Sequence, residues 1–378
     1  MNTISSQNPF FETYSTLHST VPFDKIKTGD YVPAIREGIR RQNAEIEAII
    51  RNPEVPTFAN TVLAYEKSGE MLHRVSTVFG NLLSAETDDD LQELAKEIMP
   101  MMSEHENNIS LNEELFARIK AVYEQQDKET LSPEQHKLLE DIYNGFVRNG
   151  ANLLGEDKEK YRALCKELSL LTLQFSENNL KETNDYKLVI TDKSQLAGLP
   201  ESAVEAAAET AGEKGVEGWV FTLQAPSYGP FLTYADSRDL RRELYMAYNT
   251  KCTHDNASNN LEIVKKLANV RMEIAQLLGY DNFAEYNLQE RMAQNSESVY
   301  KLLDQLLEAY TPTAKQEYAE VQALARQAEG EDFVLMPWDW AYYSHKLKDR
   351  KFNIDDELLR PYFELNNVKQ GVFGLATR

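Results

Sequence analysis

Amphipathic helical periodicity is the feature that most constrains this sequence, because the best segments carry their own start and stop signals. Residues 132–135 read Ser-Pro-Glu-Gln, which supplies an N-cap serine, a proline at the first helical position and a glutamine that can complete a capping box. Asn149 and Gly150 predict the end of this helix. The apolar residues between these signals recur at helical spacing: Leu138, Leu139, Ile142, Tyr143, Phe146 and Val147.

The same pattern recurs elsewhere and predicts a mainly α fold. Residues 88–98 begin with three aspartates and continue with apolar residues on one face, and residues 161–175 carry a second stripe of this kind. Gly (16) and Pro (13) are few among 378 residues, which argues against a turn-rich β-sandwich, a collagen or a disordered linker. We therefore expect a body of many amphipathic helices.

One stretch departs from the helical pattern and predicts a small inserted β element. Residues 186–190 and 219–223 are typical of short strands, because they are rich in β-branched and aromatic side chains. Between them, residues 201–210 predict a helix and the glycines of 212–218 predict a turn. Residues 224–230 contain two prolines and a glycine, so we expect a loop there.

Three consecutive regions follow from this pattern. Residues 1–180 form an N-terminal helical region, residues 181–235 hold the small β/α insertion, and residues 236–378 form a second helical region. Gly279 predicts a break in the helices of this last region. No repeat of 20 to 50 residues is evident, so the chain is not a solenoid of similar units.

Net charge and cysteine content exclude several classes of protein. The chain has 40 basic and 61 acidic residues, a net charge of -21, which argues against binding to nucleic acid or to an anionic membrane surface. No run of 18 apolar residues is present, and residues 1–7 lack the basic and apolar parts of a secretory signal. Cys165 and Cys252 lie too far apart in sequence to suggest a disulfide framework. These features lead us to expect a cytoplasmic protein.

The histidines do not supply a recognisable zinc motif. A helical His-Glu-x-x-His site needs two imidazoles four residues apart, and none of the six histidines has such a partner. The nearest approach is His105-Glu106, where Ile109 stands in place of the second ligand. We therefore expect this segment to be an ordinary solvated helix face.

The other candidate catalytic residues also favour structural interpretations. Cys165 lies on the apolar stripe of its helix, which favours a buried structural thiol. Cys252, beside Lys251 and His254 at a helix end, is the more exposed candidate, although short-range clustering is weak evidence for a nucleophile. Among 61 acidic residues, the sequence selects no catalytic carboxylate pair.

The aromatic run at residues 337–343 has two interpretations. Its tryptophans and tyrosines could wall a groove, because their rings are apolar and their tips polar. They could equally be the aromatic start of a helix packed between two others, because large rings are highly buried on average.

Several stretches, taken in order, resemble the thimet-oligopeptidase and peptidyl-dipeptidase family of zinc metallopeptidases, and within it the bacterial dipeptidyl carboxypeptidase branch. Asn-Pro-Phe-Phe at 8–11, Val-Pro-Phe-Asp-Lys-Ile at 21–26 and Pro-Thr-Phe-Ala-Asn-Thr at 56–61 are similar to the start of that branch. The later matches are residues 31–35, 63–66, 226–232, 236–248, 271–280, 284–286, 292–293, 338–343, 358–363 and 371–375. The resemblance covers nearly the whole chain.

This resemblance implies a two-lobed, mostly helical peptidase with a deep channel, in which zinc activates a water molecule to attack a short peptide. The branch removes dipeptides from the C-terminus of its substrates. The His-Glu-x-x-His helix and the other zinc ligands would lie beyond Arg378, so the resemblance assigns no catalytic residue and no metal ligand to this chain. We expect an inactive N-terminal part that binds no zinc, whose partners are short peptides and the missing C-terminal catalytic part. The candidate peptide contacts are Trp338, Trp340, Tyr342, Tyr343, Tyr228 and Phe231.

Two alternatives stay open from the sequence. The chain could be a non-catalytic helical interaction protein, which would predict that the natural reading frame ends near Arg378. It could also be a metal-independent hydrolase with paired carboxylates, although nothing beyond the abundance of acidic residues favours this.

Overall fold

The computed structural model describes residues 8–125, 130–353 and 356–378, and it divides into two compact units. Unit 1 comprises Met1–Glu177 and Glu262–Gln294, and unit 2 comprises Asn178–Leu261 and Asn295–Arg378. The predicted mainly α fold is confirmed, since the strands of the described residues form one two-stranded sheet. Residues 1–7, in which the sequence predicts no secretory signal, lie outside the described part.

The two compact units are each built from two separate stretches of the chain. The chain leaves unit 1 after Glu177, and residues 262–294 return to it. The physical reason is an apolar face on this returning segment, from which Ile263, Leu267 and Ile274 pack against Tyr161 and other residues of the first segment. The sequence pattern shows that such a face exists, but not which distant segment covers it.

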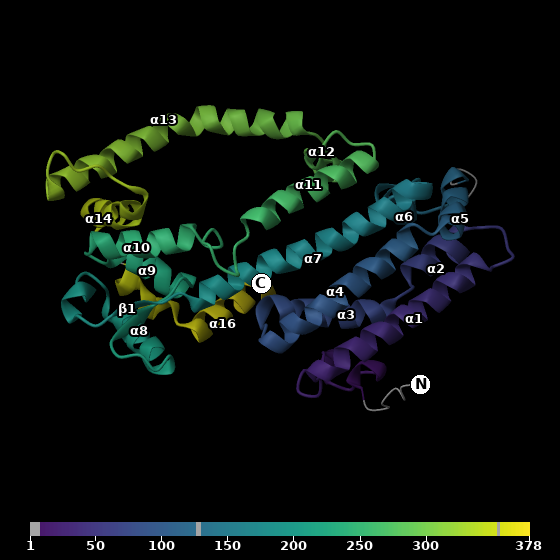
Figure 1. The fold of residues 1–378 in the computed structure, drawn as a ribbon, viewed down its shortest axis with the longest axis horizontal. Helices are drawn as coiled ribbons and strands as arrows, with labels where there is room; N and C mark the ends of the chain where they lie inside the picture. Colours follow the sequence, from purple (N-terminus) through teal and green to yellow (C-terminus); the bar gives the residue numbers. More distant parts are fainter. Residues whose placement is uncertain (1–7, 126–129, 354–355) are drawn as a thin grey trace. The chain divides into compact units, whose positions relative to one another are not determined.

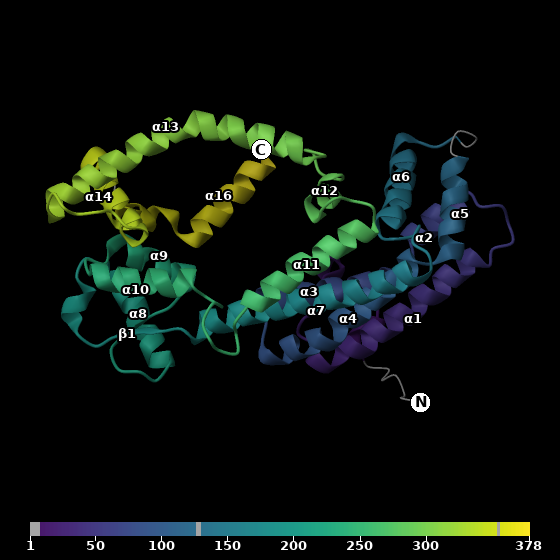
Figure 2. The same ribbon diagram turned by 45° about the horizontal axis from the view of Figure 1, so that its top comes forward.

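Unit 1 is a helical body with several apolar clusters. Its helices α1, α3 and α4 lie side by side (Figures 1 and 2), and α5 packs against α6. The helices of this unit are α1 (Tyr31–Ile50), α2 (Leu63–Glu66), α3 (Glu70–Ala85), α4 (Asp89–Ser110), α5 (Glu113–Glu124), α6 (Pro133–Arg148), most of α7 (Gly155–Asp185), most of α11 (Leu261–Leu277) and α12 (Phe283–Leu288).

Helix α6 forms as its start and stop signals predict. The Ser132 side chain accepts a hydrogen bond from the backbone N–H of Gln135, and the Gln135 side chain accepts one from the backbone N–H of Ser132. This capping box satisfies two backbone donors that the first helical turn leaves free. Leu139, Ile142 and Phe146 are buried on the apolar face, so the predicted face is the packed one.

Glu37 in α1 provides a pH-dependent contribution to the stability of unit 1. Its carboxylate accepts hydrogen bonds from Arg40 and Arg41, which lower the pKa of Glu37 from 4.5 to about 2. Because the pKa is lowered by folding, the stabilisation is present above pH 4.5 and is lost as the pH falls toward about 2.

Glu37→Gln is therefore expected to lower the free energy of unfolding by about 1 kcal/mol at pH 7, a value kept small because both arginines are largely exposed. The loss should shrink as the pH falls below 4.5. Far-UV circular dichroism during urea unfolding measures it. Glu104→Gln, an exposed change of the same kind on α4, is the control; a loss in Glu37→Gln that stays constant with pH would contradict the assignment.

Unit 2 contains the small sheet, together with helices that precede and follow its strands along the chain. Its elements are the end of α7, β1 (Leu188–Ile190), α8 (Glu201–Glu213), β2 (Trp219–Phe221), α9 (Ala225–Tyr234), α10 (Arg238–Asn249), α13 (Ser296–Glu329), α14 (Trp340–Phe352), α15 (Asp356–Leu359) and α16 (Leu365–Thr377). The C-terminal part of α13 packs against α14, as Figure 2 shows, through a cluster that includes Val321, Ala325 and Tyr343.

The two strands predicted from the sequence pair antiparallel, with Leu188 opposite Phe221 and Ile190 opposite Trp219. Gly218 precedes β2 with φ at +102°, and a Cβ atom at this position would lie 2.3 Å from the carbonyl oxygen of Ile190. Only glycine fits such a close approach of backbone to backbone. The glycine-rich segment therefore serves as a turn, as predicted.

The loop predicted at residues 224–230 is wrong, because the structure has helix α9 there. Pro226 lies in the first turn, where a missing N–H removes no helical hydrogen bond. Phe231 and Leu232 are buried on one side of the helix, and Phe231 packs in the apolar cluster around the sheet. Burial of these side chains outweighs the local tendency of Pro and Gly to break a helix.

Candidate functional site

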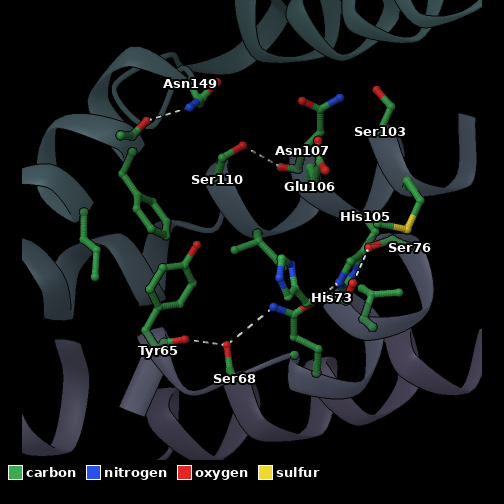
Figure 3. A pocket seen from close by; sticks show the side chains of 18 of the residues that line it. Tyr65, Ser68, His73, Ser76, Ser103, His105, Glu106, Asn107, Ser110 and Asn149 are labelled. Atoms are coloured by element: carbon green, nitrogen blue, oxygen red, sulfur yellow. Dashed lines mark hydrogen bonds between the residues drawn. The ribbon is translucent and has the colours of Figure 1, made fainter. Parts of the chain in front are cut away.

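A pocket of about 1420 Å³ lies within unit 1, walled by α4, α6, α7 and the segment that joins α2 to α3. Figure 3 shows Glu106 and Asn107 of α4 on one side of it, with Tyr65 and Ser68 on the other. Met102, Glu106 and Ser110 of α4 also line the pocket. They lie four residues apart, so neighbouring turns of the helix present them to the same cavity.

A chain of hydrogen bonds fixes the floor of this pocket (Figure 3). The Ser68 hydroxyl donates to the Tyr65 carbonyl oxygen at 2.7 Å and accepts from Gln42 Nε2 at 3.4 Å. Gln42 Oε1 lies 2.8 Å from His105 Nε2. Because this oxygen can only accept, His105 carries its proton on Nε2 and leaves Nδ1 as an acceptor.

The expectation that His105 lies on a solvated helix face is wrong. His105 is 4 % exposed, and Asn107 and Ile109 on the same helix are also buried. Burial lowers the pKa of His105, which favours the neutral form of the imidazole. The physical reason is that His105 lies seven residues after Ile98 and four before Ile109, on the buried face of α4.

Glu106 is the chemically distinctive group of the pocket. Its side chain makes no hydrogen bond or ion pair with the described residues, and the surrounding protein raises the pKa of its carboxyl. Its negative charge also contributes to the raised pKa of the Tyr65 phenol and of the Cys165 thiol. The Glu106 carboxylate, which has no cationic partner among the described residues, therefore makes ionisation of Tyr65 and Cys165 less favourable.

The surroundings of both cysteines suit a structural role and not a reactive thiol. Burial raises the pKa of Cys165, which hydrogen-bonds to Tyr161 and Asn107 in unit 1. Cys252, predicted to be the more exposed thiol, is 5 % exposed, and its pKa is raised to about 11 by burial and by Glu182. Glu182 also accepts a hydrogen bond from the Cys252 backbone N–H and lies 2.7 Å from His254 Nδ1. A thiol of this kind is a poor nucleophile at neutral pH.

The four aromatic candidates at residues 338–343 lie in unit 2 and differ in exposure. Tyr342 and Tyr343 are buried in the cluster shared with α13. Trp338 is partly buried and meets the Tyr245 ring at 6.3 Å. Trp340 is 42 % exposed and lies parallel to the Tyr318 ring, with the centroids 6.3 Å apart. Burial therefore agrees with the packed-helix interpretation for Tyr342 and Tyr343, whereas Trp340 keeps a partly exposed ring.

The other two candidates lie on α9. Tyr228 is partly buried and stacks on Tyr248 at 4.5 Å. Phe231 is fully buried and meets the Phe221 ring at 4.6 Å, so in this structure it has no exposed surface to offer a peptide. Tyr245 and Tyr248 both belong to α10, and this helix therefore contacts both candidate segments.

A buried ion network that sequence reasoning missed holds the aromatic run in place. Asp339, between the two tryptophans, is fully buried and accepts hydrogen bonds from Arg238 at 2.7 Å and from Arg241 at 3.0 Å. Arg241 is 1 % exposed and also donates to the Ala235 carbonyl oxygen at 2.7 Å. The available signal was the spacing of Arg238 and Arg241, one helical turn apart on α10.

Neither a metal centre nor a membrane-spanning helix is found in the part of the chain that the structure describes. Residues 8–125, 130–353 and 356–378 contain no group of three or more His, Cys, Asp or Glu side chains arranged to hold a metal ion. Over the same residues, every helix is too short or too polar to cross a bilayer.

Comparison with known proteins agrees with the resemblance seen in the sequence. The sequence model of peptidase family M3 matches residues 231–378. The dipeptidyl carboxypeptidases of Escherichia coli and Salmonella typhimurium are 37 % and 34 % identical to the chain over 99 % of its length, and oligopeptidase A of Salmonella typhimurium is 32 % identical over 96 %. The chain spans about 55 % of the length of these relatives. On this evidence, residues 231–378 match peptidase family M3, and nearly the whole chain is similar to dipeptidyl carboxypeptidases and to oligopeptidase A.

Proposed function

We propose that this chain is the N-terminal part of a zinc-dependent peptidyl-dipeptidase that releases C-terminal dipeptides from short peptides, and that the chain is inactive alone. The observation that carries the proposal is the match to two dipeptidyl carboxypeptidases along 99 % of the chain but only 55 % of their length. The 378 residues contain no His-Glu-x-x-His sequence. The zinc ligands would then belong to the remaining part of the protein.

Exposed apolar side chains in unit 2 support a further part of the same protein as the partner. On α13, Tyr300, Leu307 and Tyr310 are each more than half exposed, and on α16 the same holds for Val372 and Phe373. Large apolar patches on a protein surface mark sites of interaction. Both helices lie within the stretch that matches the peptidase family.

The test is hydrolysis by the purified chain with added zinc. The substrates are two peptides of the same sequence, one with a free C-terminus and one amidated, and products are identified by mass spectrometry. The Escherichia coli dipeptidyl carboxypeptidase serves as the positive control. We expect no dipeptide from this chain with either peptide, and zinc-dependent release from the free peptide would overturn the proposal of inactivity.

The same proposal assigns peptide contact to the exposed aromatic surface of unit 2. Trp340 is the most exposed of the six candidates, Trp338 and Tyr228 are partly exposed, and Phe231, Tyr342 and Tyr343 are buried.

Trp340→Ala is expected to weaken binding of a fluorescent peptide with a free C-terminus about tenfold, as measured by anisotropy, because aromatic anchors contribute most to peptide binding. Phe352→Ala removes a ring that is 65 % exposed on the same helix and serves as the control. Equal affinity of the two variants would contradict a role for Trp340.

A further inference from the structure

Helix α13 carries an apolar seam along most of its length. From residue 300 to residue 328, positions spaced alternately three and four residues apart form this α13 seam, and only Glu317 among them is polar. The apolar members are Tyr300, Leu303, Leu307, Tyr310, Ala314, Val321, Leu324 and Ala328. This spacing is that of a heptad repeat, in which the seam of one helix faces a second helix.

The two ends of the α13 seam have different surroundings. At the C-terminal end, Val321 is buried in the cluster that includes Tyr342 and Tyr343 of α14, which lies beside α13 in Figure 2. At the N-terminal end, all residues from 300 to 310 are exposed, and Leu307 and Tyr310 are 67 % and 65 % exposed. The same seam is therefore a helix–helix interface at one end and open at the other.

A hollow of about 570 Å³ lies on the open half of the α13 seam. Its lining residues are Asp304, Leu307, Glu308, Thr311, Pro312 and Lys315. Pro312 stands inside the helix, where a proline bends the backbone because it removes a hydrogen bond. In helix–helix packing, a side chain of the facing helix inserts into a hollow of this kind.

Charge separates two possible occupants, a second copy of this chain and a different helix. Residues 296–320 of α13 include five acidic and two basic side chains, and the chain as a whole has a net charge of -21. Two copies of this surface would bring carboxylates close to carboxylates, which is unfavourable. A helix with lysine or arginine beside its own apolar seam would instead meet Asp304 and Glu308 with the opposite charge.

We propose that the open half of the α13 seam is the docking surface for one amphipathic helix from the remaining part of the peptidase. This helix has an apolar seam of its own, with lysine or arginine side chains beside it. The origin of the helix rests on the proposed function, in which the 378 residues are one part of a longer protein. Its position and chemistry rest on the α13 seam itself.

Thiol labelling tests the proposal by comparing this chain with the protein translated from its whole natural reading frame. Leu307→Cys places a thiol on the open half of the α13 seam. Gln305→Cys places one on the opposite, exposed side of the same helix and is the matched control. Parallel labelling of each protein without the new cysteine corrects for Cys165 and Cys252. Circular dichroism confirms that the variants are folded.

The expected result is protection at one position alone. A fluorescent maleimide should label Leu307→Cys about tenfold or more slowly in the whole protein than in this chain, whereas the two rates for Gln305→Cys should agree within about twofold. Equal labelling of Leu307→Cys in the two proteins would overturn the docking surface.

Self-association is the second outcome that would overturn the proposal. Light scattering would then show a dimer of this chain that Leu307→Asp converts to a monomer, and a second copy would be the occupant. The labelling uses neither zinc nor hydrolysis, so unprotected Leu307→Cys in a whole protein that cleaves peptides leaves the peptidase proposal intact. Conversely, protection in a whole protein that cleaves no peptide would support the docking surface and contradict the peptidase proposal.

Discussion

Asp339→Ala is expected to lower the free energy of unfolding of unit 2 by about 3–5 kcal/mol, the usual cost of removing one partner from a buried ion pair. The variant leaves Arg241, which is 1 % exposed, with an uncompensated charge. It also removes the acceptor of the Met336 backbone N–H at 3.0 Å. The segment that carries Trp338 and Trp340 loses its main attachment to α10.

Tryptophan fluorescence during urea unfolding measures this effect in unit 2 alone, because Trp219, Trp338 and Trp340, the three tryptophans of the chain, all belong to that unit. Asp332→Ala is the control, since Asp332 lies on the exposed loop before the same segment and should cost less than about 0.5 kcal/mol. If both variants unfolded at the same urea concentration, the network would not stabilise unit 2.

Phe231→Ala is expected to cost about 3–5 kcal/mol in the same assay, because the deleted ring leaves a cavity between α9 and the sheet. Phe231 is fully buried and packs edge-to-face on Phe221. Phe231→Leu fills most of this space and should cost less. Phe352→Ala, at an exposed site, should be close to neutral.

This result separates a core role of Phe231 from direct contact with a peptide. A variant with unchanged stability but weaker peptide binding would contradict the packing described for α9. Loss of stability with unchanged peptide affinity of the folded fraction would agree with it.

The parts of the fold that the sequence predicts are those set by local chemistry. The capping box of α6, the acidic start of α4 and the two short strands all form as expected, since their signals lie within a few residues of the element itself. Helix α9 is the counterexample. Its prolines favour a loop locally, and burial of Phe231 against residues distant in sequence decides otherwise.

The candidate site was less predictable, because burial and pairing depend on distant segments. Nothing near His105 in sequence indicates that Gln42 of α1 receives its hydrogen bond, and nothing near Cys252 indicates that Glu182 of α7 will cover it. Likewise, the charge of Asp339 within an aromatic run becomes meaningful only when α10 supplies Arg238 and Arg241. The resemblance to a known family indicates a peptidase, whereas the pocket of unit 1 is formed by segments that are distant in sequence and is not indicated by any of them alone.

The central claim, that this chain is one part of a zinc peptidyl-dipeptidase, is tested most directly by sequencing the natural transcript through and beyond the codon for Arg378. The account predicts that the reading frame continues in frame into a His-Glu-x-x-His sequence, with a further glutamate downstream as the third protein ligand of zinc. A stop codon close to Arg378 would contradict it and would favour a non-catalytic helical interaction protein.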